Sequence, residues 1–102
     1  MNNSISIEEV LQIDTPTIVD IREYYYYNIG HIIGAISIPY YNLLTNHKHY
    51  LTYYNTYYLY CEKGEQSKEL VEKLNSFGYN TLNIIGGYQE YLKVFGKIIQ
   101  EQ

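Results

Sequence analysis

The chain has 102 residues, of which 46% are hydrophobic and 18% are charged, a composition that suits a globular domain and excludes a disordered segment. Its net charge is −4 and its seven Lys and Arg residues form no cluster, which excludes the basic face that nucleic-acid binding requires. No apolar run approaches the roughly 20 residues that span a bilayer, and the N-terminal residues lack the features of a signal peptide. We therefore expect a soluble, cytoplasmic protein with no nucleic-acid or membrane partner.

Apolar clusters alternate with amphipathic stretches along the chain, at a spacing typical of repeated strand–helix units. In the first half, Gly30 closes a short helix or irregular segment, and Pro39 ends a strand because it removes a ladder donor. The expected order there is strand 5–7, helix 8–13, strand 17–22, a short helix or irregular segment at 23–28, strand 35–38 and helix 40–50.

A helix with one apolar face is the clearest element of the second half. Its apolar positions are Leu70, Val71, Leu74 and Phe77, and Gly78 follows its end. The expected order there is strand 57–60, helix 67–77, strand 81–85, a Gly86-Gly87 turn, helix 88–95 and a solvated tail.

Strands that are separated by helical connections predict an α/β fold. We expect a mostly parallel five-stranded sheet with helices on both faces, in one domain that spans residues 1–102 and has its core at about 5–95. Ligands of such sheets bind beyond the carboxyl ends of the strands. The fourth expected strand runs directly into Cys61, so this rule places the cysteine at the functional edge of the sheet.

Cys61 is the only cysteine, which excludes an intramolecular disulfide and a multi-thiolate metal site. A loop between a strand end and a helix start turns successive backbone N–H groups into one concavity, and the helix N-terminus adds positive potential there. Sulfur in such a place is favoured as the thiolate, which is the nucleophilic form. We expect Gly64 to take a positive φ in this loop and Ser67 to cap the following helix.

The pattern Cys61-x-x-Gly64-x-x-Ser67 resembles the active-site loop of the rhodanese family. Three further segments resemble family motifs in the same order and spacing: Asp-x-Arg in residues 19–23, Gly-His-Ile-x-Gly-Ala-x-x-x-Pro in residues 30–39, and the Gly-Gly turn of residues 86–88 with Tyr91 after it. The resemblance runs from about residue 5 to residue 95, which is nearly the whole chain.

The resemblance implies sulfurtransferase chemistry. Cys61 would take a sulfane sulfur from a donor, hold it as a persulfide and pass it to a thiol or protein acceptor, with neither a metal nor an organic cofactor. The residues expected to form the active-site and substrate-binding loop are Glu62, Lys63, Gly64, Glu65, Gln66 and Ser67. Asp20, Arg22 and His31 are expected to support the site structurally: the first two through an ion pair or backbone hydrogen bonds, and His31 through hydrogen bonding rather than acid–base catalysis.

The loop differs from many members of the family, which carry Arg or another basic residue in it. Here Lys63 is flanked by Glu62 and Glu65, and Gln66 stands where Arg or Thr is frequent. Two carboxylates against one cation repel a dianion and disfavour the thiolate. We therefore expect weak activity with thiosulfate and a preference for a protein persulfide or a small-thiol persulfide as donor.

The cysteine has three other possible interpretations. A buried thiol without chemistry is one, and a non-catalytic rhodanese-like binding or regulatory module is another. A cysteine phosphatase or arsenate reductase requires Cys-x5-Arg, whereas Ser67 stands six residues after Cys61 and no arginine follows. The sequence leaves open the oligomeric state, the pathway, and whether the tyrosine run at 24–27 contacts a partner or reflects biased composition.

Overall fold

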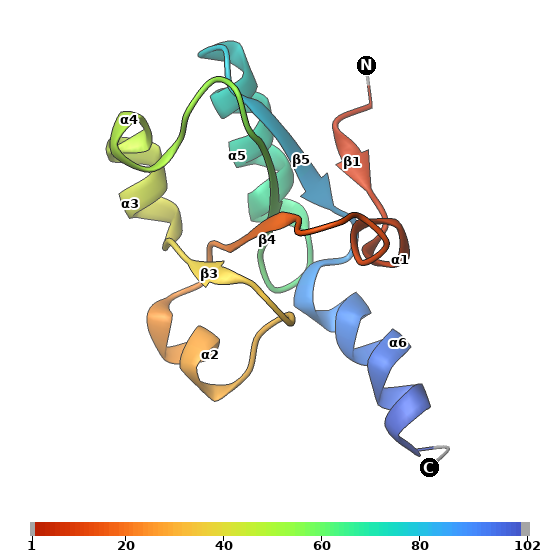
Figure 1. The fold of residues 1–102 in the computed structure, drawn as a ribbon. Helices are drawn as coiled ribbons and strands as arrows, with labels where there is room; N and C mark the ends of the chain where they lie inside the picture. The colour runs from red at the N-terminus through yellow and green to blue at the C-terminus, as the bar shows by residue number, and fades with distance from the viewer. Residues whose placement is uncertain (1, 101–102) are drawn as a thin grey trace.

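The computed structural model describes the backbone of residues 2–100 and the side chains of residues 2–96. Five strands form one sheet in the order β1-β5-β4-β2-β3, and every neighbouring pair is parallel (Figure 1). The strands are β1 (Ser4–Ile5), β2 (Thr17–Asp20), β3 (Ile36–Ser37), β4 (Thr56–Tyr60) and β5 (Asn80–Ile84). The helices are α1 (Ile7–Val10), α2 (Tyr24–Ile29), α3 (Tyr40–Thr45), α4 (His47–Tyr50), α5 (Glu65–Ser76) and α6 (Gly87–Gln100). The predicted α/β class with a five-stranded parallel sheet is confirmed.

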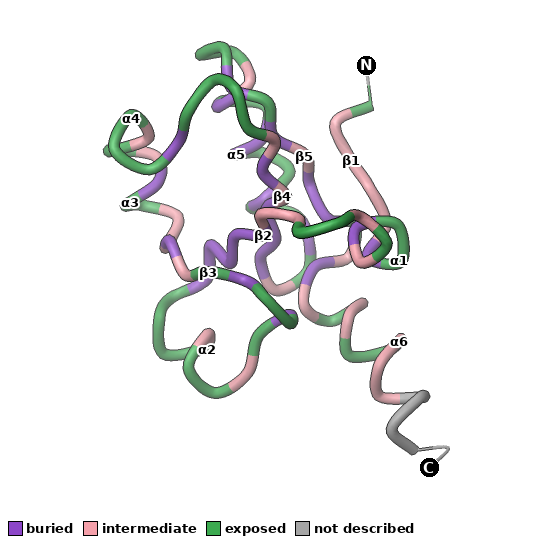
Figure 2. Tube along the Cα trace, in the orientation of Figure 1, coloured by how far each residue is buried: buried purple, intermediate pink, exposed green. Residues whose placement is uncertain are grey.

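Two hydrophobic clusters cover the two faces of the sheet. Successive strand residues alternate between them: Val19 and Leu59 belong to the cluster beneath α3 and α5, whereas Ile18 and Tyr60 belong to the cluster beneath α1 and α6. Figure 2 shows the buried residues concentrated along the central strands, with α2 and α4 largely exposed. This alternation directs Cys61, one residue after Tyr60, into the cluster on the α5 side.

Several element boundaries differ from those predicted. Helix α5 begins at Glu65 and not at Ser67, because Gly64 turns the chain into it with φ of +96°. The predicted capping role of Ser67 is therefore wrong, since this residue lies buried inside the first turn. Strand β2 ends at Asp20, two residues early, because the Asp20 carboxylate accepts the backbone N–H of Arg22 at 2.9 Å and the chain turns.

Other differences lie in the helices. Ser6 was predicted to lie in a strand but caps α1, because its Oγ accepts the N–H of Glu9 at 3.1 Å. The helix predicted at 40–50 is broken into α3 and α4 at Asn46, which has φ of −127° and ψ of 35°. Helix α6 extends to Gln100, past the predicted end at 95. The tail expected at 101–102 lies outside the described residues. None of the described helices is long and apolar enough to cross a membrane.

The tyrosine run at 24–27 forms most of α2. Its first three residues are exposed, whereas Tyr27 is half-buried and donates its hydroxyl to the carbonyl oxygen of Ala35 at 2.7 Å. The run therefore does not face inward as a whole. A partner contact at this helix stays a prediction.

A glycine turn between β5 and α6 packs directly against the loop after β4. Gly86 and Gly87 both have positive φ, and a Cβ on Gly87 would overlap the carbonyl oxygen of Cys61 and lie 2.9 Å from the carbonyl carbon of Glu62. At this place Tyr88 donates its N–H to the Cys61 carbonyl at 2.9 Å, and Gln89 donates its N–H to the Glu62 carbonyl at 3.0 Å. The N-terminus of α6 thus holds the cysteine loop in place.

We expect Gly87→Ala to lower the free energy of unfolding by about 2–4 kcal/mol, from positive-φ strain and a clash with backbone that cannot move. Gly34→Ala is the matched control: Gly34 also has positive φ, but nothing lies within 4 Å of its added Cβ. That variant should lose only about 1 kcal/mol. Urea denaturation of both variants measures the difference, and equal losses would contradict a close approach at Gly87.

Candidate functional site

Cys61 directly follows β4 and is only 3% exposed. Its Sγ accepts the backbone N–H groups of Gly64 at 3.1 Å and of Ser67 at 3.3 Å. The Ser67 Oγ lies 3.3 Å from the same sulfur and donates to Asn83 Oδ1 at 2.5 Å. Because a hydroxyl has one proton, Ser67 can accept from a Cys61 thiol while it donates to Asn83, or turn its proton toward a Cys61 thiolate.

The loop after Cys61 surrounds a hollow of about 270 Å³, lined by Cys61, Glu62, Lys63, Glu65 and Gln66. The backbone N–H groups of Lys63, Glu65 and Gln66 have no acceptor within the part of the chain that the structure describes. Together with the N–H groups of Gly64 and Ser67, which are directed at Sγ, they give the hollow a backbone surface of hydrogen-bond donors. Such a surface stabilises negative charge on a sulfur atom or on a group attached to it.

A buried ion pair lies next to the loop. Arg22 donates from Nε and Nη2 to the Asp20 carboxylate, the shortest of these bonds being 2.7 Å, and from Nη2 to the Gly30 carbonyl at 2.8 Å. Tyr60 donates its hydroxyl to Asp20 Oδ2 at 2.6 Å and accepts the N–H of Ile32 at 3.1 Å. The Arg22 guanidinium lies 4.2 Å from the centroid of the Tyr88 ring.

Glu62 connects this ion pair to the cysteine loop. Its Oε1 accepts Arg22 Nη1 at 3.1 Å, and its Oε2 accepts the side-chain amide of Gln89. Burial lowers the pKa of Arg22, but its hydrogen bonds and charge interactions with Asp20 and Glu62 more than offset this and raise it overall. Arg22 therefore stays charged, and it offsets part of the negative charge of Glu62 as well as that of Asp20.

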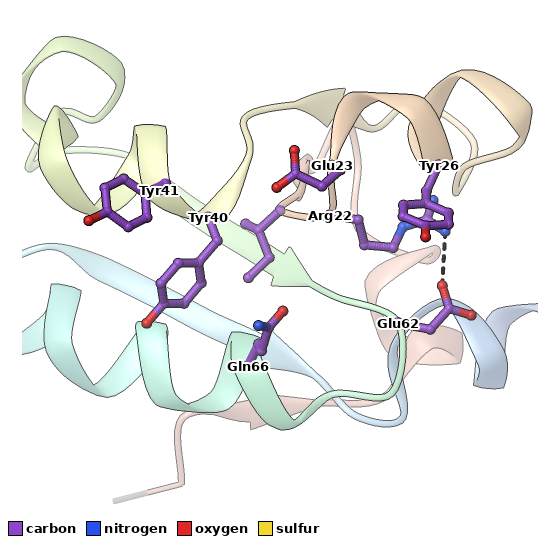
Figure 3. Close-up of a pocket in the computed structure, with 8 residues that line it drawn as sticks. Arg22, Glu23, Tyr26, Tyr40, Tyr41, Glu62 and Gln66 are labelled. Atoms are coloured by element: carbon purple, nitrogen blue, oxygen red, sulfur yellow. Dashed lines mark hydrogen bonds and ion pairs between the residues drawn. The ribbon is translucent and has the colours of Figure 1, made fainter.

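A larger cavity of about 540 Å³ lies on the other side of Glu62 and Gln66. Arg22, Glu23 and Tyr26 line it from the end of β2 and from α2, and Tyr40 and Tyr41 line it from α3. In Figure 3 these residues lie on one side, where Tyr40 extends toward Gln66 and Arg22 is joined to Glu62 on the opposite side. Glu62 and Gln66 also line the hollow at Cys61, so the two spaces share a wall.

The structure brings most of the sequence-predicted site residues together. Gly64 and Ser67 contact the sulfur, Glu62, Lys63, Glu65 and Gln66 line the hollow, and Asp20 and Arg22 reach the loop through Glu62. His31 is the exception: its ring stacks on Tyr27 at 3.9 Å and hydrogen-bonds the Tyr27 carbonyl oxygen at 2.9 Å. Among the described residues, no hydrogen bond or ring contact joins His31 to the cysteine loop.

Sequence reasoning missed four contributors: Tyr60, Asn83, Gln89 and the aromatic wall of the larger cavity. Asn83 carried a signal, because it is a polar residue between apolar neighbours in a strand, and here it is buried. Gln89, Tyr40 and Tyr41 carried none, because they reach the site from segments that are distant along the chain. Tyr60 stands beside Cys61 in the sequence, but its hydroxyl contacts Asp20, forty positions earlier.

The sequence matches the family model of the rhodanese-like domain over residues 6–93. The chain therefore belongs to the rhodanese-like domain family. It is 32% identical over 92 residues to the adenylyltransferase and sulfurtransferase uba4 of Ogataea parapolymorpha, a match that covers 85% of this chain and 23% of that protein. The chain thus spans about a quarter of the length of this curated relative.

Solved structures give the same result. A Staphylococcus saprophyticus protein superimposes with a TM-score of 0.79 and 33% identity over 89% of this chain and 93% of the other. A rhodanese-related protein of Thermoplasma volcanium does so with a TM-score of 0.82 and 29% identity over 89% and 91% of the two chains. A human single-domain sulfurtransferase shares the fold at 21% identity, with a TM-score of 0.76 over 91% and 97%.

The buried Tyr60 hydroxyl generates a prediction about stability and pH. Burial and the hydrogen bond to Asp20 raise the pKa of Tyr60 well above the usual value of about 10. The native state therefore keeps this proton where the unfolded state has lost it. The contribution of Tyr60 to stability is complete below pH of about 10 and is lost as the pH rises further.

We expect Tyr60→Phe to lower the free energy of unfolding by about 1–3 kcal/mol at neutral pH, because Asp20 and the Ile32 N–H each lose a partner. Above pH of about 10, the difference from the wild type should shrink by about 1.4 kcal/mol per pH unit. Urea denaturation between pH 7 and about 11 measures both effects. Tyr54→Phe, at a residue that is 92% exposed, should show neither, and a pH-independent difference for Tyr60→Phe would contradict the assignment.

Proposed function

We propose that this protein is a sulfurtransferase that carries a sulfane sulfur as a persulfide on Cys61. The observation that carries the proposal is the setting of Sγ, which receives two backbone N–H groups beside a hollow lined by further unpaired ones. The family match supports the same function, since the family includes sulfurtransferases. We extend the proposal to one domain over residues 1–102, acting in the reducing cytoplasm, where a single thiol stays reduced.

The reaction needs neither an oxidant nor a cofactor. In loading, the Cys61 thiolate attacks the outer sulfur of a donor persulfide, the donor's S–S bond breaks, and the donor thiolate leaves. In unloading, an acceptor thiolate attacks the outer sulfur of the Cys61 persulfide, and Cys61 leaves as the thiolate. Each anion arises where the backbone N–H groups of the loop can stabilise it. Ser67 can follow the change of charge by turning its proton between Asn83 and Sγ.

The side chains around the hollow favour a persulfide donor over thiosulfate. Arg22 and Gln89 hold the Glu62 carboxylate, which reduces its repulsion of an incoming anion. Glu65 is exposed, lines the hollow, and has no ion-pair partner among the described residues. Its charge therefore repels the thiosulfate dianion more strongly than the paired charge of Glu62 does. We propose a protein persulfide or a low-molecular-weight persulfide as the donor, and a thiol, free or on a protein, as the acceptor.

A non-catalytic binding module is the alternative function within the same family. Such a module needs the fold, but it needs no thiol at the point toward which the N–H groups of the loop are directed. The position of Cys61 Sγ favours the catalytic function, because the two N–H bonds to it contribute little to a neutral buried thiol, a weak acceptor.

Intact mass spectrometry tests the function directly. Incubation with glutathione persulfide or with a cysteine desulfurase and cysteine should add one sulfur atom, which a reducing agent removes. Thiosulfate should load the protein more slowly than glutathione persulfide. Cys61→Ser should gain no sulfur, while Ser76→Ala, at the C-terminal end of α5 and far from the loop, should load like the wild type. If no donor adds sulfur to the wild type, the binding module becomes the better account.

The acidic rim generates a second prediction. Glu65→Gln should raise the rate of loading from thiosulfate about two- to fivefold, because one repulsive charge is removed, and added salt should shrink the gain. Benzenethiosulfonate, a monoanion, should gain by a smaller factor. Glu72→Gln makes the same charge change elsewhere on α5 and should leave the rate unchanged. Equal responses of the two variants would contradict a local effect of Glu65.

A further inference from the structure

The larger cavity, between α2, α3 and the cysteine loop, takes no part in the loading and unloading of sulfur at Cys61. Its volume of about 540 Å³ lies in the range of small-molecule sites, and it opens beside the hollow at Cys61. Three tyrosines and Ile21 form its apolar wall. Glu62 and Gln66 form the boundary with the hollow, so one bound molecule can occupy the cavity and present a sulfur atom to Cys61.

The charges of the cavity are unbalanced. Arg22 is the one cation that lines it within the described part of the chain, and its nitrogen atoms already donate to Asp20, Glu62 and the Gly30 carbonyl. Glu23 also lines the cavity and has no ion-pair partner among the described residues. Burial and the carboxylate of Glu69 raise the pKa of Tyr40, so a further negative charge acts on this wall. Lys63 lines the neighbouring hollow and not the cavity.

The charges and aromatic rings that line the cavity favour a cationic group over an anionic group. An anionic group would meet the unpaired carboxylate of Glu23 and a guanidinium with little donor capacity left. A cationic group would meet that same carboxylate together with the faces and hydroxyls of the tyrosine rings. Aromatic faces attract ammonium and guanidinium groups, most strongly where water is excluded.

We propose that the cavity binds a positively charged group, an ammonium or a guanidinium, carried by the thiol that accepts sulfur from Cys61. This inference rests on the proposed function and names the class of its acceptor. Glu23 supplies the counter-charge, and Tyr26, Tyr40 and Tyr41 supply the aromatic wall. The acceptor is then a molecule with a cation at one end and a thiol at the other, either a small aminothiol or a cysteine-containing segment with a nearby Lys or Arg.

Three matched peptides test the preference: acetyl-Cys-Gly-Lys-amide, acetyl-Cys-Gly-Gln-amide and acetyl-Cys-Gly-Glu-amide. The protein is first loaded from glutathione persulfide and desalted, and loss of the added sulfur in a single turnover is followed by intact mass. Each rate is divided by the rate of the same peptide with glutathione persulfide alone, which removes differences in thiol reactivity. We expect the Lys peptide to react about 3- to 10-fold faster than the Gln peptide, and the Glu peptide to be slowest.

Variants locate the preference in the cavity. Glu23→Gln should bring the ratio of the Lys and Gln peptides close to one, and Tyr41→Leu should lower it. Glu8→Gln makes the same charge change on α1, outside the cavity, and should leave the rates and the ratio unchanged. A parallel comparison of cysteamine with 2-mercaptoethanol separates the sources: a gain there points to a small aminothiol, and a gain with the peptide alone points to a protein segment.

The outcomes separate this inference from the proposed function. Protein that loads sulfur and passes it to all three peptides at equal normalised rates would overturn the inference while the sulfurtransferase function stands. The inference would also be overturned, with the function intact, if Glu23→Gln and Glu8→Gln changed the ratio of the Lys and Gln peptide rates equally. Protein that never gains sulfur would overturn the function itself, and the acceptor preference with it.

Discussion

The buried carboxylate of Asp20 is the constraint on which the rest of the site depends. A fully buried charge is costly unless it is paired and hydrogen-bonded, and Asp20 is 0% exposed. Its partners are the backbone and guanidinium of Arg22 and the hydroxyl of Tyr60. To satisfy one charge, the fold must therefore bring together the end of β2, the end of β4 and, through the Gly30 carbonyl and the Ile32 N–H, the loop before β3.

The same network gives the cysteine loop its electrostatic character. Arg22 is held between Asp20 and Glu62, with the Tyr88 ring against its face, so its charge is shared between a buried partner and a partner at the site. Glu62 is in turn fixed by Gln89 from α6, whose first N–H groups also hold the loop carbonyls. The loop is thus positioned by side chains from one direction and by a helix N-terminus from another. The sulfur needs no basic side chain of its own, because its donors are backbone groups.

The class of fold and the position of Cys61 could be predicted, because β-branched runs and a one-sided apolar helix are local signals. The start of α5 could not, because either Gly64 or Ser67 can occupy a helix N-terminus, and the positive φ expected at Gly64 is compatible with both starts. The charge balance of the cysteine loop could not be predicted for a similar reason. Beside Lys63 in the sequence, Glu62 counts as an unpaired acid, yet its cation is Arg22, forty positions earlier. The tyrosines around the larger cavity come from two segments that only the folded chain brings together.

The brevity of the two outer strands has a consequence for the behaviour of the folded protein at high concentration. Strands β1 and β3 lie at the edges of the sheet, and each is only two residues long. Each offers few unpaired backbone groups to a strand from another molecule, and Pro39 prevents β3 from continuing. A chain so rich in tyrosine and isoleucine has high β-propensity throughout. Its short edges are therefore a defence against edge-to-edge polymerisation, provided by the topology and not by charged gatekeeper residues.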